Sequence, residues 1–363
     1  MSELIFSCDN IYWYGEFRSG TIIKSQNNVS FEKGTYKSKK LQGWICPGLV
    51  NAHCHLEFSH LGKCSQEIKG QGMAQFILWI QKIRNQSLEN LEQSTENVLT
   101  NFQEEGTFFI ADICNSLNTQ KIKEKFTKIY FQNFWEVFGL NPEISKNKWL
   151  EIQKNAKKIN ALITLHAPYS CSLELIHKVN SYNTFLQSIH LAESKEELEY
   201  FQNHDRKLKN AFIDMGINPT FLVKKLPYSE AILSEKVQNY LLVHNVFLDE
   251  KKIPNNILKN CYFCICLTSN IFLHNQTVSL AFIKKLKNKI CLGTDSLATN
   301  DQLSILKEMN YLRNLGIETN DIVNMSTIHG YQALKIPEHK LQAYHNVVWI
   351  YEKQDQFNTK VLW

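Results

Sequence analysis

The middle of the chain alternates short apolar runs with longer polar stretches. Eight runs rich in aliphatic and aromatic residues predict strands, and they cover residues 49–57, 107–112, 129–134, 161–166, 185–190, 240–244, 262–267 and 290–295. Between them the apolar residues have helical spacing, and we expect helices over 76–84, 91–105, 195–203 and 302–315. Alternating strands and helices are typical of parallel sheets. Eight such units predict an α/β fold, a (β/α)₈ TIM barrel over residues 47–339.

The two ends of the chain show a different pattern. Short apolar runs separated by turn residues predict strands at 4–6, 11–14, 21–23 and 29–31 near the start, and at 346–351 and 360–363 near the end. Neither group is large enough to bury a core of its own. We therefore expect residues 1–46 and 340–363 to combine into one small β domain, a composite layer beside the barrel.

Composition narrows the class of protein. Apolar residues make up 44% of the chain, which is ample for a large core, and the formal charge of +5 is small for 363 residues. The lysines are dispersed, so we expect no nucleic-acid partner. No apolar run approaches the roughly 18 residues needed to span a membrane, and Met1-Ser2-Glu3 does not resemble a secretion signal. We expect a cytoplasmic protein without a membrane anchor.

The ten cysteines lie mostly within apolar runs, which favours reduced, buried thiols over a disulfide framework. Cys261, Cys264 and Cys266 form the one cluster of note. A structural zinc site needs a second paired set at similar spacing, and the sequence has none. We interpret the cluster as core thiols of a strand.

Polar residues stand at the ends of the predicted strands, where a barrel of this type carries its chemistry. They are His53, His55, Asp112, His166, His190, His244 and Asp295. Any one of them alone is more often a satisfied core or rim residue, and a His-x-His pair alone can simply cap a strand. Burial of so many polar groups is costly without partners, so as a set they predict a metal centre.

The expected roles follow from the ligand chemistry. His53 and His55 are two residues apart on a strand and point the same way, and with His190 and Asp295 they would hold one divalent ion, leaving room for water. Such an ion lowers the pKa of water from about 15.7 towards roughly 7. Glu193 follows the fifth strand and could carry a proton. Its alternative role is a first-turn carboxylate that complements a helix dipole.

Several motifs together resemble the amidohydrolase superfamily, in its branch of chlorohydrolases and nucleoside or nucleobase deaminases. The motifs are Pro47-Gly-Leu-Val-Asn-Ala-His53-Cys-His55-Leu-Glu57, His190-Leu-Ala-Glu193, His244-Asn245, Ser269-Asn270, Gly293-Thr-Asp295-Ser296 and Ser326-Thr-Ile-His-Gly-Tyr-Gln-Ala-Leu334. The resemblance covers nearly the whole chain. It is specific for the superfamily and less specific for the substrate.

The resemblance implies one zinc or iron ion bound by His53, His55, His190 and Asp295. It also implies that Glu193 carries protons, that His244 orients the attacking water, and that Asp295 doubles as ligand and base. Relatives with two metals have a carboxylated lysine after the fourth strand. This chain has His166 there, which indicates a single metal and a substrate contact from His166.

The early loops resemble aminodeoxyfutalosine deaminases of the menaquinone pathway, through Trp79-Ile80 and Arg84. This likeness implies hydrolytic deamination of an adenine-type nucleoside, either 6-amino-6-deoxyfutalosine or adenosine. Trp79 would stack on the base, although its spacing also suits a helix core. Relatives acting on S-adenosylhomocysteine or methylthioadenosine place an acidic residue where this chain has Leu78. Further substrate contacts are expected from Glu57, Asn270 and Ser296.

Other readings of the sequence stay open. Guanine or S-adenosylhomocysteine deamination, or dechlorination of a triazine, would use the same metal residues. A non-catalytic scaffold of this fold is a second option, although such proteins usually lose metal ligands. A cysteine hydrolase using Cys54 or Cys171 is a remote third, because neither has a local nucleophile motif. The expected partner is a small nucleoside-like molecule, and a homodimer is one option for the assembly.

Overall fold

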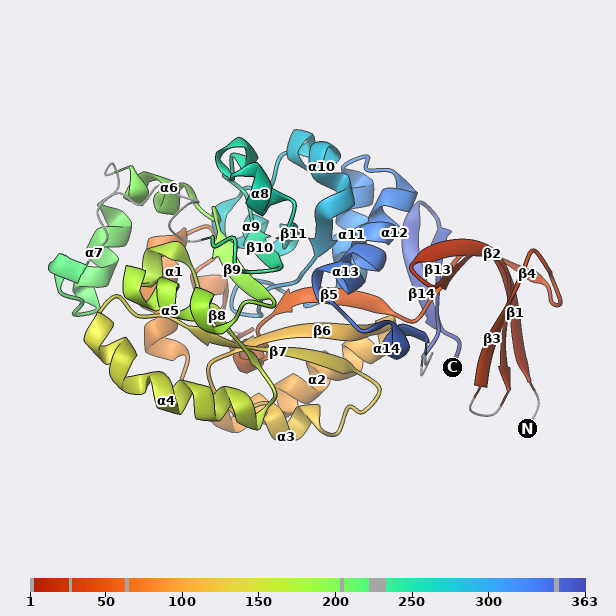
Figure 1. Cartoon of the computed structure of the whole chain (residues 1–363), viewed down its shortest axis with the longest axis horizontal. Coiled ribbons are helices and arrows are strands. Elements are labelled where there is room, and N and C mark those ends of the chain that lie inside the picture. Colours follow the sequence, from red (N-terminus) through yellow and green to blue (C-terminus); the bar gives the residue numbers. More distant parts are fainter. Residues whose placement is uncertain (1–2, 26–27, 63–64, 203–205, 222–232, 343–345) are drawn as a thin grey trace.

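Two parallel four-stranded sheets form the centre of the molecule (Figure 1). The structure is a computed structural model that describes residues 3–25, 28–62, 65–202, 206–221, 233–342 and 346–363. One sheet has the order β5-β6-β7-β8 and the other the order β12-β11-β10-β9. The prediction of an α/β fold with parallel strands is therefore confirmed.

The eight central strands lie at the positions that the apolar runs predicted. They are β5 (Leu49–Cys54), β6 (Thr107–Cys114), β7 (Tyr130–Val137), β8 (Leu162–Leu165), β9 (Gln187–Leu191), β10 (Tyr240–His244), β11 (Cys261–Ile265) and β12 (Ile290–Leu292). Every residue of β5, β6, β9, β10 and β12 is buried. Strands covered on both faces are typical of parallel sheets.

Hydrogen bonds connect the two sheets at both of their junctions. Beside β5, the backbone N–H groups of Thr294 and Asp295 donate to the carbonyl of His53 over 3.0 and 3.1 Å. Beside β8, the N–H of His190 donates to the carbonyl of His166 over 2.9 Å. The carboxyl ends of strands from both sheets consequently meet in one region.

Helices connect the strands and surround them. Their bounds are α1 (Met73–Ile83), α2 (Leu91–Glu105), α3 (Gln120–Lys123), α4 (Pro142–Lys158), α5 (Leu173–Tyr182), α6 (Lys195–Phe201), α7 (Lys207–Asp214), α8 (Asn255–Leu258), α9 (Leu267–His274), α10 (Leu280–Leu286), α11 (Ile305–Asn314), α12 (Thr319–Ser326), α13 (Ile328–Ala333) and α14 (Glu338–Gln342). In the described part of the chain, none of them is long and apolar enough to traverse a lipid bilayer.

The helix starts have a simple local cause. Ser172, Ser194 and Ser304 each accept a hydrogen bond at the first turn of α5, α6 and α11, and satisfy an N–H that the helix cannot. The cap at Ser304 explains why the helix expected from residue 302 begins at Ile305. The helix expected over 195–203 ends at Phe201, and Asn203 lies outside the described residues.

Both ends of the chain join one six-stranded sheet, drawn at the right of Figure 1. In sheet order its strands are β14 (Gln356–Val361), β13 (Val348–Lys353), β4 (Lys40–Cys46), β1 (Leu4–Trp13), β2 (Glu16–Ser25) and β3 (Asn28–Lys33). The runs at 4–6 and 11–14 belong to one strand, because a bulge between Cys8 and Ile11 lets the pairing continue. The unpredicted β4 links β1 to β13 and so unites the two ends.

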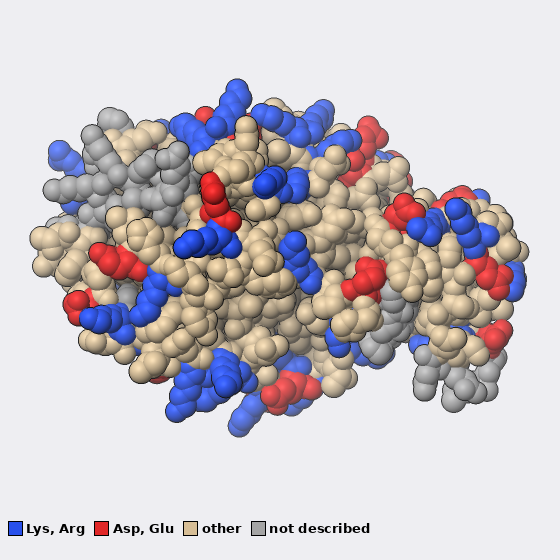
Figure 2. Space-filling view, in the orientation of Figure 1, with Lys and Arg blue, Asp and Glu red and all other residues tan. Residues whose placement is uncertain are grey.

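The surface and the thiols add little that points to a partner. On the face shown in Figure 2, lysine and arginine side chains are scattered among acidic and uncharged ones.

Nine cysteines are described, and all nine are buried free thiols. Cys261 and Cys264 lie in β11, as expected of core thiols, while Cys64 lies outside the described residues.

Asp112, one of the polar residues at a strand end, belongs to a buried ion pair. Lys123 lies 2.7 Å from Oδ2 of Asp112 and donates to the side-chain oxygen of Asn133 over 2.7 Å. The other oxygen of Asp112 accepts the N–H of Leu56 over 3.1 Å. Burial lowers the pKa of Lys123, but Asp112 outweighs burial and raises it, so the lysine stays charged. The pair ties β6 to the segment that follows His55.

We predict that Lys123→Met destabilises the fold by about 3 kcal/mol or more, because it leaves the carboxylate of Asp112 buried without a counter-charge. Chemical denaturation measures the loss. The double variant Asp112→Asn/Lys123→Met should recover most of it, since the amide is neutral and its oxygen still accepts from Leu56. A single variant as stable as the wild type would contradict a structural role for this pair.

Candidate metal centre and active site

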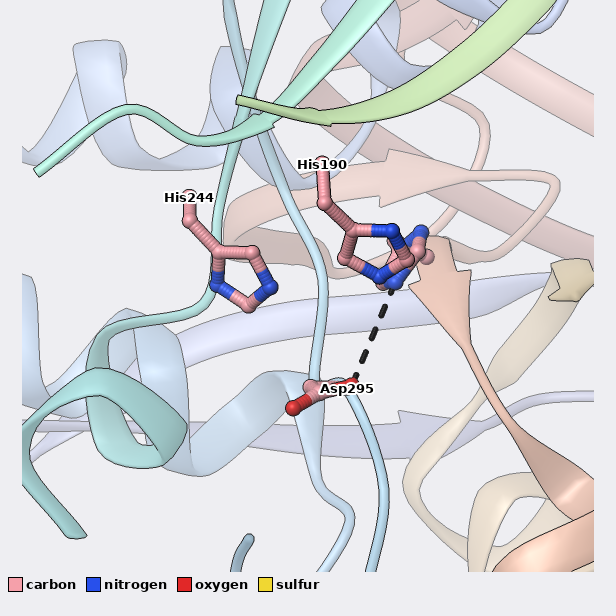
Figure 3. A group of neighbouring side chains, drawn as sticks. His190, His244 and Asp295 are labelled. Carbon is pink, nitrogen blue, oxygen red and sulfur yellow. Dashed lines mark ion pairs between the residues drawn. The ribbon is translucent and has the colours of Figure 1, made fainter. Parts of the chain in front are cut away.

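Imidazoles and one carboxylate converge where the strands end. His53 lies in β5, His190 in β9, His244 closes β10 and Asp295 follows β12. In Figure 3, His190, His244 and Asp295 point toward one another from separate strands. The ring centroid of His53 lies 4.7 Å from that of His190 and 4.9 Å from that of His55. The structure therefore brings together residues that are widely separated in the sequence.

The ligand atoms are spaced closely enough to share one ion. His53, His190, His244 and Asp295 each offer an atom, and these atoms lie within 4.8 Å of one another. Nε2 of His55 is 3.7 Å from Oδ1 of Asp295 and 3.4 Å from Nε2 of His190. Imidazole and carboxylate ligands in this number suit a divalent transition metal with an open position for water.

The hydrogen bonding of the histidines fits a metal. Within the described residues, both ring nitrogens of His53 and Nδ1 of His55 are buried without a hydrogen-bond partner. Such groups are costly unless something else satisfies them. Burial holds the pKa of His53 well below its usual range and lowers that of His55 to about 3. Both rings are therefore neutral near pH 7, as metal binding requires.

Asp295 is fixed by its neighbours. Its Oδ2 accepts hydrogen bonds from the hydroxyls of Ser269, over 2.7 Å, and Thr299. The backbone is left-handed at Asp295 (φ 58°) and at His244 (φ 73°), which is uncommon for residues other than glycine. Strained backbone of this kind concentrates at functional sites, where surrounding structure maintains it. Here it turns two side chains at strand ends toward the same point.

His244 and Glu193 form the polar side of the centre. Nδ1 of His244 lies 3.0 Å from the side-chain nitrogen of Asn270, and its Nε2 lies 3.6 Å from Oε2 of Glu193. The other oxygen of Glu193 is 3.3 Å from Nε2 of His274. Burial raises the pKa of Glu193, but His244 and His274 outweigh burial and lower it to about 2. Glu193 is therefore a carboxylate that can accept a proton.

A cavity of about 570 Å³ opens onto this centre. His55, His190, Glu193, His244 and Asp295 line its polar end. The wall also includes many apolar side chains, among them Phe76 and Ile77 of α1, Phe138, Tyr169 and Phe212 of α7, together with charged and polar ones such as Arg84, Asn115 and Lys148. An apolar cavity with a few convergent polar groups is the usual form of a small-molecule site.

Only two of the five predicted substrate-binding residues line this cavity. His166 and Ser296 belong to its wall. The other three, Glu57, Asn270 and Trp79, do not line the cavity. Glu57 accepts hydrogen bonds from the N–H of Asn115 and the hydroxyl of Ser116, and Asn270 contacts His244. The indole N–H of Trp79 donates to Glu67 over 3.2 Å. In α1 it is Phe76, rather than Trp79, that faces the cavity.

Two further titratable residues lie at or beside the site, and the sequence did not predict them. Glu136 lies in β7 with one oxygen 3.5 Å from Nδ1 of His190, and it lines the cavity. The strand was expected to stop at residue 134, which left Glu136 outside it; a lone acidic residue in an apolar run was the available signal. His274, which contacts Glu193, carried no local signal because its partner is 81 residues away.

The two cysteines considered as nucleophiles are poorly suited to that role. Burial raises the pKa of Cys171 to about 12 and that of Cys54 well above its usual value. Nucleophilic cysteines are thiolates, which need a lowered pKa and access to substrate. Neither thiol lines the cavity.

Comparison with known proteins gives consistent matches. A model of the amidohydrolase family matches residues 44–340. In sequence, the chain is 26% identical to an adenosine deaminase of Helicobacter pylori over 319 residues, covering 82% of this chain and 76% of that protein. It is 26% identical to an aminodeoxyfutalosine deaminase of Nitratiruptor sp. over 285 residues, covering 73% of this chain and 66% of that protein. The structure of Helicobacter pylori aminofutalosine deaminase in complex with methylthio-coformycin matches with a TM-score of 0.74 and 20% identity, over 96% of this chain and 92% of that chain.

We predict that His53→Ala abolishes metal binding, because it removes a central ligand while His55, His190 and Asp295 remain. Elemental analysis of purified protein grown with ample zinc and iron measures the bound metal. The exposed His177 on α5 offers a matched control, since His177→Ala removes an imidazole that does not line the cavity. Equal metal content in His53→Ala and His177→Ala would reject His53 as a ligand.

Proposed function

This chain belongs to the amidohydrolase family, and from that premise we propose that it is a metal-dependent hydrolytic deaminase of an adenine-type nucleoside. The observation that carries the proposal is the group of imidazoles and Asp295 at the polar end of the cavity, with Glu193 beside it. Supporting matches are an adenosine deaminase and an aminodeoxyfutalosine deaminase, each 26% identical.

One divalent ion, zinc or iron, would be held by His53, His55, His190 and Asp295. These residues fit because buried imidazole nitrogens of His53 and His55 have no other partner among the described residues. When bound, the ion lowers the pKa of a water so that hydroxide is available at neutral pH. His244, whose ligand atom lies within 4.8 Å of those of His53, His190 and Asp295, would orient that water.

The side chains supply the proton transfers. Glu193 takes a proton from the attacking water and delivers it to N1 of the adenine ring, which makes C6 more electrophilic. Asp295 takes the second proton of the water and passes it to the departing amino group. A C6–O bond forms, the C6–N bond breaks, and ammonia leaves. Proton transfer by a positioned carboxylate contributes about 10²- to 10⁴-fold in rate.

The preferred substrate is 6-amino-6-deoxyfutalosine, with adenosine as the second choice. The cavity continues beyond the polar end into an apolar part lined by Phe76 and Ile77 of α1 and by Phe212 and Met215 at α7. This part would hold the group attached to the nucleoside. His166 and Ser296, both in the cavity wall, would contact the base or its ribose.

We also propose that the two parallel sheets form one (β/α)₈ barrel over residues 47–339. The hydrogen bonds from Thr294 to His53 and from His190 to His166 support closure at both junctions. The described parts of 1–46 and 340–363 would form a separate β domain, which the shared six-stranded sheet supports.

The test of the function is direct. Metal-loaded protein is assayed with aminodeoxyfutalosine and adenosine for ammonia release and for the absorbance change from adenine to hypoxanthine. Guanine, S-adenosylhomocysteine and a chlorinated triazine, assayed in parallel, separate other chemistries of the family. If neither adenine nucleoside is turned over, the proposal is wrong. A protein that binds no metal at all would point to a scaffold instead.

We predict that Glu193→Gln keeps its metal and loses about 10²-fold or more in kcat, because the amide cannot exchange a proton with the ring. Steady-state kinetics measures the rate, and elemental analysis verifies the metal. Glu57→Gln is the control: this buried glutamate sits near the site but outside the cavity wall. A Glu193→Gln enzyme with near-normal turnover would require another proton carrier.

A further inference from the structure

His274 stands between Glu193 and a second cavity. It is the last residue of α9, its side chain is only 7% exposed, and its Nε2 lies 3.3 Å from Oε1 of Glu193. The active-site cavity includes Glu193 in its wall but not His274. A separate cavity of about 240 Å³ includes His274 but not Glu193. The hydrogen-bonded pair of His274 and Glu193 therefore lies between the active-site cavity and the second cavity.

The second cavity has a largely polar wall and is large enough for water. Its wall includes Ser194, Lys195, Glu196, Glu199 and Gln276. Lys195 and Glu199 form an ion pair at 3.3 Å, and Glu196 accepts the N–H of Ala74 at the start of α1. A water occupies about 30 Å³ and needs polar partners, and both requirements are met here.

The two oxygens of Glu193 face different neighbours. Oε2 lies 3.6 Å from His244 on the side of the metal centre, and Oε1 lies 3.3 Å from His274 on the side of the second cavity. Glu193 hydrogen bonds to His274 through Oε1, while Oε2 faces His244 within ion-pair distance, so the carboxylate can receive a proton on one side and release it on the other. Imidazole is suited to such a transfer, because it gains and loses a proton near neutral pH.

The proposed deamination consumes a proton, and the present inference rests on that function. Hydrolysis itself is balanced: C6–NH₂ and water give C6=O, with a hydrogen on N1, and ammonia. At neutral pH ammonia takes up one more proton and becomes ammonium, and this proton comes from the solvent. A nucleoside in the main cavity would displace water from the face of Glu193 that lines it.

We propose that His274 passes a proton from water in the second cavity to Glu193 during each turnover. Glu193 then gives the proton to the departing ammonia, which leaves as ammonium, and His274 recovers a proton from the water behind it. His274 acts through Glu193 and lies outside the substrate cavity. The relay needs no reactant other than solvent protons.

The test compares wild type, His274→Ala and His274→Gln with the adenine nucleoside that the wild type deaminates. For His274→Ala we expect a loss of about tenfold or more in kcat, because the proton route is broken. We expect KM to change by less than about twofold, since His274 does not line the substrate cavity. Free imidazole in the assay should restore kcat of His274→Ala by entering the vacated space, and should leave the wild type unchanged.

The glutamine variant separates a relay from a simple hydrogen bond. Its amide can donate to Oε1 of Glu193 but cannot pass a proton, so we expect kcat to stay low. Turnover of His274→Gln at the wild-type rate, or failure of imidazole to raise kcat of His274→Ala, would overturn the relay. His177→Ala serves as the control for loss of an exposed imidazole. Absence of turnover by the wild type would instead overturn the function and the relay together.

Discussion

The site depends on imidazoles buried without enough hydrogen-bond partners. His53 has neither ring nitrogen satisfied among the described residues, and His55 lacks a partner at Nδ1. Burial keeps the rings neutral, so they cannot gain stability by forming ion pairs with Asp295. A divalent ion would accept one nitrogen from each imidazole and an oxygen of Asp295 at once. Burial of these groups without partners is costly, so a bound ion would stabilise the folded state.

Backbone geometry delivers these groups to one place. Parallel strands end at a common edge, so single residues at strand ends meet although they are far apart in sequence. Left-handed backbone at His244 and Asp295 then turns both side chains inward. The strain is offset by the packed surroundings, including the hydroxyls of Ser269 and Thr299 that hold Asp295. The ion pair of Asp112 with Lys123 holds the neighbouring strand by a different means.

The apolar runs predicted the strands, and the polar residues at their ends predicted a group of side chains that the structure brings together. Both features leave strong local signals in the sequence. It could not identify which face of α1 meets the cavity. That helix is apolar on several sides, and Phe76 rather than Trp79 lines the cavity. Glu136 was missed because β7 runs three residues further than its apolar run. His274 was missed because a contact across 81 residues has no sequence period.

Glu193 shows why a carboxylate at this position needs two neighbours. Burial alone would raise the pKa of Glu193 and favour a neutral acid, which could not accept a proton. His244 and His274 reverse that preference, one from each side. The carboxylate then stays ionised although it is buried, and its two oxygens face different imidazoles. A proton carrier must both gain and lose its proton in each cycle, and an ionised carboxylate at the wall of the cavity is free to accept one.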